Sequence, residues 1–103
     1  MDLQEYKKKA LSTDHKDYSQ FHTGESTARL DYGTIGMATC SAKILNFVKK
    51  TKMNAKPLDR EAITEELGDL LWYMNLTIDE LGITFEDVMK NNIEKISKIY
   101  PTK

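Results

Sequence analysis

The sequence is poor in cysteine, proline, glycine and long apolar runs, and each shortage excludes a class of protein. Its single cysteine cannot form a disulfide within the chain and is typical of a reducing compartment. Two prolines and five glycines give little support to strands and hairpins. No apolar run approaches the length needed to cross a membrane, and residues 1–10 lack the apolar stretch of a signal peptide. We therefore expect a cytoplasmic protein without membrane contact.

The charges nearly cancel, and this balance excludes strongly charged partners. Fifteen Lys and Arg residues against 16 Asp and Glu residues give a formal net charge of −1. Nothing in this balance indicates direct nucleic-acid binding. The apolar content of 40% is typical of a folded chain, and 103 residues are enough for one modest core. We expect a single domain over residues 1–103.

The spacing of apolar residues predicts four helices, at about 2–11, 27–50, 59–81 and 84–99. Asp59 is the predicted N-cap of the third helix, and Gly82 its C-terminal stop. Thr84 and Asp87 form the predicted capping box of the fourth. The second helix is expected to break at residues 51–57, with Pro57 as its stop. These elements predict an all-α bundle of about four helices, whose wide apolar faces indicate self-association.

A polar stretch at residues 13–26 separates the first two predicted helices. It has little periodicity and is long for a connection in a small domain, so it is expected to be a mobile loop or one that orders around a ligand or partner. His15 and His22 lie in it. Because they are seven residues apart with no cysteine nearby, we interpret them as surface histidines rather than metal ligands.

The segment EELGDLLWY, residues 65–73, contains the residues best suited to a catalytic or metal-binding role. Glu66 and Asp69 are three residues apart on a predicted helix, so their carboxylates project side by side. A divalent cation would relieve their repulsion, but such pairs are common on solvated helix faces, which the spacing alone favours. Trp72 and Tyr73 follow, and spacing alone indicates core aromatics.

In combination, E-L-G-D-hydrophobic-W-Y followed by N-I-E-K and a closing Y-P resembles the MazG-like nucleotide pyrophosphohydrolase family, within the all-α NTP pyrophosphatase superfamily. The resemblance extends over nearly the whole chain. It implies an all-α bundle, assembled as a dimer or tetramer, that cleaves nucleoside triphosphates to monophosphates and pyrophosphate. It also implies Mg²⁺ held by an E-x-x-E pair facing an E-x-x-D pair, with Glu66 and Asp69 as the second pair.

The chain departs from the family pattern in the first motif. The family's G-L-A-G-E-A-G-E-V corresponds to residues 36–44, so Cys40 and Lys43 stand where the first pair of glutamates is expected. A thiol is a poor ligand for Mg²⁺, and an ammonium repels the cation. We hypothesise that Lys43 pairs with Glu66 or Asp69 in place of the metal. The alternative is that its ammonium extends to the surface.

The same resemblance implies roles for further residues. Asn92 and Lys95 match family residues that help to hold phosphates, and Trp72 and Tyr73 stand where aromatics can wall a base pocket. Ile99 replaces an arginine that often precedes the closing Tyr-Pro. Cys40 has no histidine near it in sequence, so we expect a small buried filler rather than a nucleophile.

These departures favour a catalytically degenerate member that acts by binding, with no catalytic residue and no cofactor. Its ligand is expected to be a protein partner, for example a host factor blocked by a phage-encoded inhibitor in the host cytoplasm, or a nucleotide held without hydrolysis. The alternative is a Mg²⁺-dependent nucleoside triphosphate pyrophosphohydrolase with Glu66 and Asp69 as its remaining ligands. A third reading is a subunit that completes a hetero-oligomer with an active paralogue.

Overall fold

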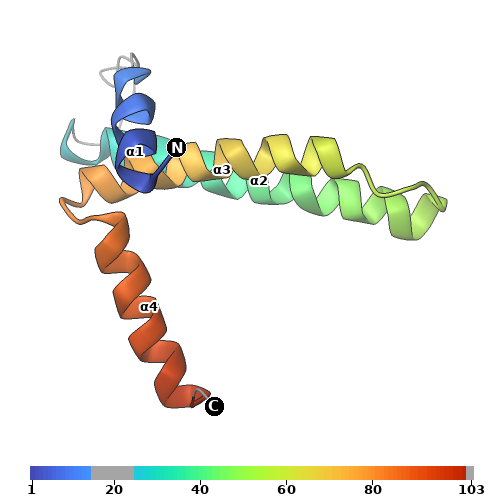
Figure 1. The fold of residues 1–103 in the computed structure, drawn as a ribbon. Helices are drawn as coiled ribbons and strands as arrows, with labels where there is room; N and C mark the ends of the chain where they lie inside the picture. The colour runs from blue at the N-terminus through green and yellow to red at the C-terminus, as the bar shows by residue number, and fades with distance from the viewer. Residues whose placement is uncertain (15–24, 102–103) are drawn as a thin grey trace.

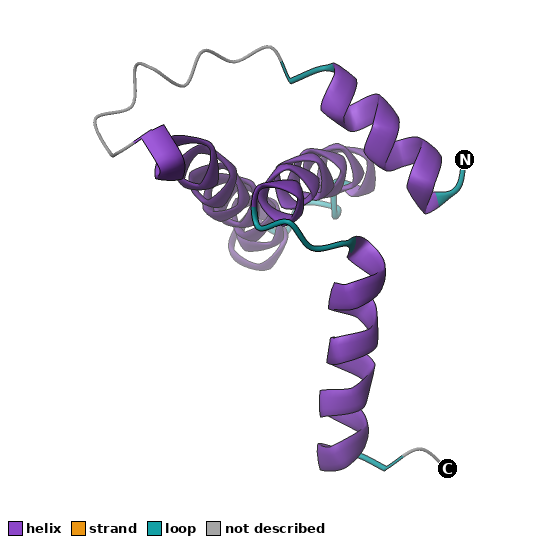
Figure 2. Cartoon of the chain, turned by 90° about the vertical axis from the view of Figure 1, so that its left-hand side faces the viewer, coloured by secondary structure: helices purple, strands orange, loops and turns teal. Residues whose placement is uncertain are grey.

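The computed structural model describes residues 1–14 and 25–101, and these form four α-helices and no strand. The helices are α1 (Leu3–Ser12), α2 (Glu25–Asn54), α3 (Arg60–Glu80) and α4 (Phe85–Ile99). The long helices α2 and α3 pack as an antiparallel hairpin, α1 lies against one end of α3, and α4 extends away at a steep angle (Figure 1 and Figure 2). The predicted all-α fold class is confirmed. No described helix is both long enough and apolar enough to span a membrane.

The helix ends follow the predicted capping residues. The Asp59 carboxylate accepts a hydrogen bond from the backbone N–H of Ala62 at 3.0 Å. Thr84 and Asp87 form a reciprocal capping box in which both hydrogen bonds are 3.0 Å long. These side chains satisfy backbone N–H groups that have no partner inside the helix, which fixes where α3 and α4 begin.

Gly82 ends α3 as predicted. Its φ of 70° lies in the left-handed region, where a residue without Cβ is not strained. The N–H of Gly82 donates to the carbonyl of Asp79 at 3.0 Å, and the N–H of Ile83 donates to that of Ile78 at 3.4 Å. This pair of bonds is a Schellman motif. It turns the chain sharply into α4.

Helix α2 is longer at both ends than the sequence predicted. It begins at Glu25 rather than Thr27 and ends at Asn54, so residues 51–54 are helical and the predicted break there is wrong. No helix-breaking residue occurs before Pro57, which disfavours helical backbone only at the residue preceding it. Ala55, with a φ of 50°, turns the chain out of the helix. Most of the predicted 13–26 loop, with His15 and His22, lies outside the described residues.

Two glycines allow α2 and α3 to approach each other closely. Gly33 and Gly36 are buried, and a Cβ built on Gly33 would overlap the hydroxyl of Thr77. A Cβ on Gly36 would overlap the ring of Tyr73. This close packing brings the middle of α2 against the middle of α3.

The core is small and lies mainly where α1, α2 and α3 meet. The buried side chains are Ala10, Ala28, Cys40, Asn75, Leu76, Thr77, Ile78 and Phe85. Four consecutive residues of α3 are therefore buried, whereas Leu67 of α3 and Leu81, directly after it, are 51% and 56% exposed. The helical spacing of apolar residues does not predict four consecutive buried residues. They are buried because neighbouring helices cover α3 from several sides near its C-terminal end.

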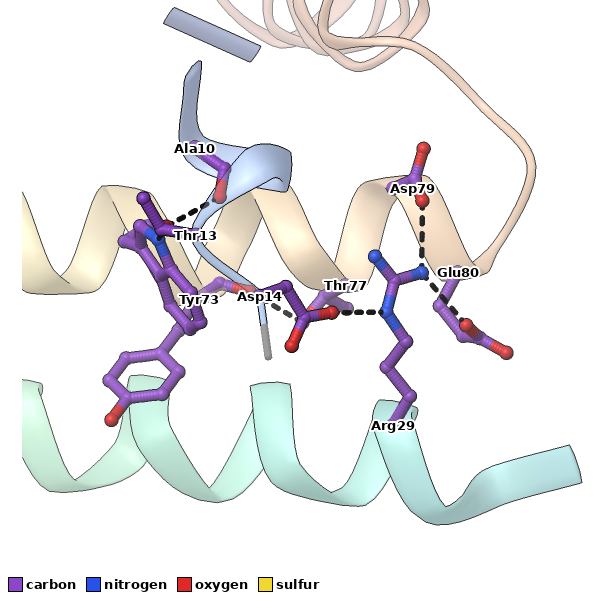
Figure 3. A network of polar contacts seen from close by, with 9 residues as sticks. Ala10, Thr13, Asp14, Arg29, Tyr73, Thr77, Asp79 and Glu80 are labelled. Carbon is purple, nitrogen blue, oxygen red and sulfur yellow. Dashed lines mark hydrogen bonds and ion pairs between the residues drawn. The ribbon is translucent and has the colours of Figure 1, made fainter. Parts of the chain in front are cut away.

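A partly buried arginine joins the helices at this end. Figure 3 shows Arg29 of α2 with three carboxylates around its guanidinium. Nε lies 3.2 Å from Asp14 Oδ2, and Nη1 lies 2.9 Å from Asp79 Oδ2 and 3.0 Å from Glu80 Oε2. The Arg29 side chain is only 20% exposed, so these contacts are poorly screened by solvent. The cluster ties the end of α1 and the end of α3 to the start of α2.

Most apolar side chains of helix α4 are left uncovered by the residues that the structure describes. Phe85 is buried at its first turn, but Met89, Ile93, Ile96 and Ile99 are 40–63% exposed. The side-chain amide of Gln4 donates to Glu86 Oε1 at 2.8 Å and holds the start of α4 to α1. Helix α4 leaves α3 at a sharp angle (Figure 1). Self-association through such faces stays a prediction.

Candidate functional site

The structure brings the two halves of the predicted motif together on facing helices. Cys40 and Lys43 of α2 face Glu66 and Asp69 of α3, at the point where the glycines of α2 let the helices approach. A pocket of about 160 Å³ opens beside them. Its lining residues are Tyr32, Ile35, Gly36, Thr39, Cys40, Lys43, Asp69 and Tyr73.

Lys43 pairs with one of the two carboxylates. Its Nζ lies 4.0 Å from Glu66 Oε1, at the outer limit of an ion pair. The Lys43 side chain is 58% exposed and that of Glu66 only 16%, so the ammonium sits at the edge of the pocket with solvent on its outer side. The second oxygen of Glu66, Oε2, is buried and has no hydrogen-bond partner among the described residues. The two alternatives for Lys43 are thus partly combined, because it contacts Glu66 and also reaches solvent.

Cys40 is a neutral buried thiol. It is 3% exposed, and its pKa is raised by burial first and then by the negative charges of Glu66 and Asp69, which the charge of Lys43 offsets only in part. A thiol with a raised pKa is a weak nucleophile at neutral pH. The prediction that Cys40 fills space in the core is confirmed.

Asp69 is exposed at the meeting point of three helices. Its negative charge contributes to raising the pKa values of Tyr6 of α1, Cys40 of α2 and Tyr73 of α3, although burial is the larger cause for each. In the part of the chain that the structure describes, no basic side chain lies within ion-pairing distance of Asp69. The pocket therefore has a carboxylate on its rim that Lys43 does not neutralise.

Three aromatic rings stand beside Asp69. The ring centroids of Tyr32 and Tyr73 are 5.5 Å apart at an interplanar angle of 75°, and those of Trp72 and Tyr73 are 5.2 Å apart at 90°. With Asp69 they line a second, more open pocket of about 350 Å³. Burial, followed by a hydrogen bond with Tyr32, raises the pKa of Tyr73 to about 12, so its phenol is neutral at physiological pH.

The aromatic side chains are held in place. The Trp72 indole N–H donates to Thr13 Oγ1 at 2.9 Å. Tyr32 was missed by the sequence reasoning. It lies four residues before Gly36 and eight before Cys40, so the helical repeat places all three on one face, and this signal would have found it.

The structure does not add Asn92 and Lys95 to this site within one chain. Both are exposed on α4, which extends away from the α2–α3 hairpin (Figure 1). Their predicted role in ligand binding, like that of Trp72 and Tyr73, stays a prediction.

The residues at this position do not fit Mg²⁺. No group of three or more His, Cys, Asp or Glu side chains with metal-binding geometry occurs in residues 1–14 or 25–101. Mg²⁺ requires several oxygen ligands in octahedral geometry, whereas Glu66 and Asp69 face a thiol and an ammonium. The buried Oε2 of Glu66 lacks a hydrogen-bond partner among the described residues, but one such oxygen does not supply an octahedral ligand set.

Comparison with known proteins gives two matches. A family model described as the MazG nucleotide pyrophosphohydrolase domain matches residues 43–103, and so includes Lys43, Glu66 and Asp69 but not Cys40. The Gene 37 protein of Mycobacterium phage L5 is 28% identical over 76 residues, which cover 70% of this chain and 67% of the phage protein. No solved structure matches.

Proposed function

We propose that this chain acts by binding rather than by cleaving nucleotides. It belongs to the MazG nucleotide pyrophosphohydrolase domain family, and we infer that it is a catalytically degenerate member. The observation that carries the proposal is the contact of Lys43 Nζ with Glu66 Oε1 at 4.0 Å. The lysine brings a positive charge to the carboxylates that would otherwise hold a divalent cation.

The charge of the site supports binding without metal. Glu66 and Asp69 carry two negative charges, Lys43 carries one positive charge, and the Cys40 thiol is neutral. The remaining single negative charge gives a cation little attraction compared with four carboxylates. A triphosphate brought to the same place without its metal would be repelled by Asp69. The binding of the metal and the binding of the triphosphate therefore both lose their electrostatic stabilisation.

The ligand that we favour is a protein partner. The similarity to a mycobacteriophage protein supports a phage-encoded protein. We propose that its partner is a host factor in the host cytoplasm. The exposed apolar side chains of α4 support a homodimer. A nucleotide held without hydrolysis is the other form of the same proposal, with Trp72 and Tyr73 beside its base and Asn92 and Lys95 of a second copy near its phosphates.

One observation favours a second function. Glu66 Oε2 is buried without a hydrogen-bond partner in the described residues, which is expected of a carboxylate that meets a cation when substrate is bound. The second candidate is therefore a Mg²⁺-dependent nucleoside triphosphate pyrophosphohydrolase with a weakened metal site.

Pyrophosphate release distinguishes the two functions. The protein is incubated with Mg²⁺ or Mn²⁺ and a panel of NTPs and dNTPs, with Glu66→Ala as the matched control. We expect the two proteins to release pyrophosphate at the same background rate. Turnover that is present in the original chain and lost in Glu66→Ala would establish the enzyme.

A variant designed to gain metal binding tests whether the replaced carboxylates explain the loss of the metal site. We expect the double variant Cys40→Glu, Lys43→Glu to bind Mg²⁺ by calorimetry and to become more stable when Mg²⁺ is added, because four carboxylates then face each other. Lys43→Gln is the control, since it removes the positive charge without adding a ligand. If Lys43→Gln alone binds Mg²⁺ as tightly as the double variant, the missing carboxylates are not the cause of weak Mg²⁺ binding in the original chain.

A further inference from the structure

We propose that the pocket lined by Tyr32, Asp69, Trp72 and Tyr73 binds a guanidinium group, the arginine side chain of a protein partner. The inference rests on the proposed binding function and names the chemistry of the partner, which that function leaves open. No residue of the pocket needs to move far, because its rings are already fixed by contacts inside the chain.

The charge at the rim selects a cation. Asp69 is exposed and, within the described residues, lies beyond ion-pairing distance of any basic side chain, because Lys43 contacts Glu66 instead. A carboxylate offers two oxygens in the geometry that a guanidinium binds with two parallel N–H groups. A free phosphate or triphosphate would meet a like charge at the same position.

The aromatic walls suit the flat surface of that cation. Tyr73 stands 5.5 Å from Tyr32 and 5.2 Å from Trp72 between ring centroids, with the planes nearly perpendicular, so the rings form a corner rather than a flat stack. A guanidinium placed in such a corner can stack on one ring face while its N–H groups reach Asp69. An ammonium is a compact charge without a flat face and uses less of this surface.

The rings are held before any ligand arrives. Trp72 donates its indole N–H to Thr13 at 2.9 Å, and the ring of Tyr73 occupies the space that a Cβ on Gly36 would fill. Side chains that are already ordered lose little conformational entropy on binding. The pocket volume of about 350 Å³ leaves room for the group between Asp69 and the rings.

Trp72 makes the test direct, because it is the only tryptophan of the chain and its fluorescence reports on this pocket. The full protein is titrated with the peptide acetyl-Gly-Arg-Gly-amide and, separately, with the same peptide carrying citrulline, which keeps the shape of arginine without its charge. We expect saturable quenching by the arginine peptide and an affinity lower by about tenfold for the citrulline peptide, as for loss of a charged hydrogen bond.

Asp69→Asn supplies the matched variant. We expect this variant to bind the arginine peptide with an affinity lower by about tenfold. Its far-UV circular dichroism should be unchanged, because Asp69 is exposed. Glu65→Gln is the control, since it removes one exposed carboxylate of the same helix that does not line the pocket, and its affinity should equal that of the original chain.

Three results would overturn the inference: equal binding of the arginine and citrulline peptides, equal binding of a lysine peptide, or an unchanged affinity in Asp69→Asn. Quenching by metal-free ATP without quenching by the arginine peptide would also overturn it and would favour the nucleotide-binding form of the proposed function. Pyrophosphate release lost in Glu66→Ala, together with arginine binding, would instead remove the proposed function and leave the guanidinium site standing.

Discussion

Gly36 shows how one missing side chain shapes the site. The ring of Tyr73 lies where the Cβ of any other residue at position 36 would be, so the glycine both lets the helices approach and fixes the aromatic wall. Gly68, on the facing helix, has no atom within 4 Å of such a Cβ. The two glycines therefore provide a matched pair for experiment.

We predict that Gly36→Ala destabilises the protein by about 1–3 kcal/mol, because the added methyl forces the Tyr73 ring or the backbone to move. Gly68→Ala should instead stabilise it by about 0.5–1 kcal/mol, since alanine loses less backbone entropy in a helix. Urea unfolding of both variants measures the two free energies. Equal effects on stability would show that the Gly36 site yields without cost.

The ionisation of Tyr73 should govern part of the stability at high pH. Its folded pKa of about 12 lies above the ordinary tyrosine value of 10.0, so the folded state holds this proton more tightly than the unfolded state. The associated stability is complete below pH 10 and is lost as the pH rises toward 12. Tyr73→Phe should therefore show a shallower loss of stability than the original chain over this range.

Thermal melts at several pH values test this expectation. Tyr100→Phe is the control, because that side chain is 71% exposed and its phenol is not enclosed by the fold. The assignment to Tyr73 would be wrong if Tyr73→Phe and the original chain lost stability in parallel above pH 10.

At the scale of the helices, Arg29 joins three segments of the chain through ion pairs. It contacts Asp14 after α1 and Asp79 and Glu80 at the end of α3. We predict that Arg29→Met, which keeps the apolar stem, destabilises the protein by about 1–3 kcal/mol because three carboxylates lose their shared cation.

The melting temperature should fall by roughly 4–8 °C for each kcal/mol in a domain of this size. Arg60→Met is the control, because Arg60 is exposed in the first turn of α3. A melting temperature unchanged by Arg29→Met would indicate that solvent screens the cluster fully.

The sequence predicted the helices and their caps because these depend on residues close together in the chain. Asp59, Thr84 and Asp87 each hydrogen-bond a backbone N–H three residues away, and such pairs can be read from spacing alone. The facing of Lys43 and Glu66 was predicted only through the family pattern. The burial of Leu76 was missed, because it depends on where α1 and α2 pack, which no local pattern encodes.

At the scale of the whole molecule, the apolar face of α4 has no cover within the described chain. Ile93 is 63% exposed and Ile99 58% exposed. Exposed apolar patches of this kind on a helix favour association with a matching surface. We expect the protein to sediment as a dimer.

We predict that Ile93→Lys shifts the protein from dimer to monomer, because it places a charge in the middle of the apolar face of α4. Asn91→Lys is the control, since it introduces the same side chain within the same turn on the opposite side of the helix. Sedimentation velocity of the three proteins measures the change. Dimers of equal stability in all three would place the interface elsewhere.

The link between α2 and α3 also has a consequence for the order of folding. Residues 55–59 join the two helices, and most contacts between distant parts of the chain are those between α2 and α3. Closing so short a loop costs little entropy, and chains dominated by such contacts fold quickly. We therefore expect the α2–α3 hairpin to form early, at a rate independent of protein concentration. The lasting protection of α4 against hydrogen exchange should come later, in a second-order step that quickens as the concentration rises.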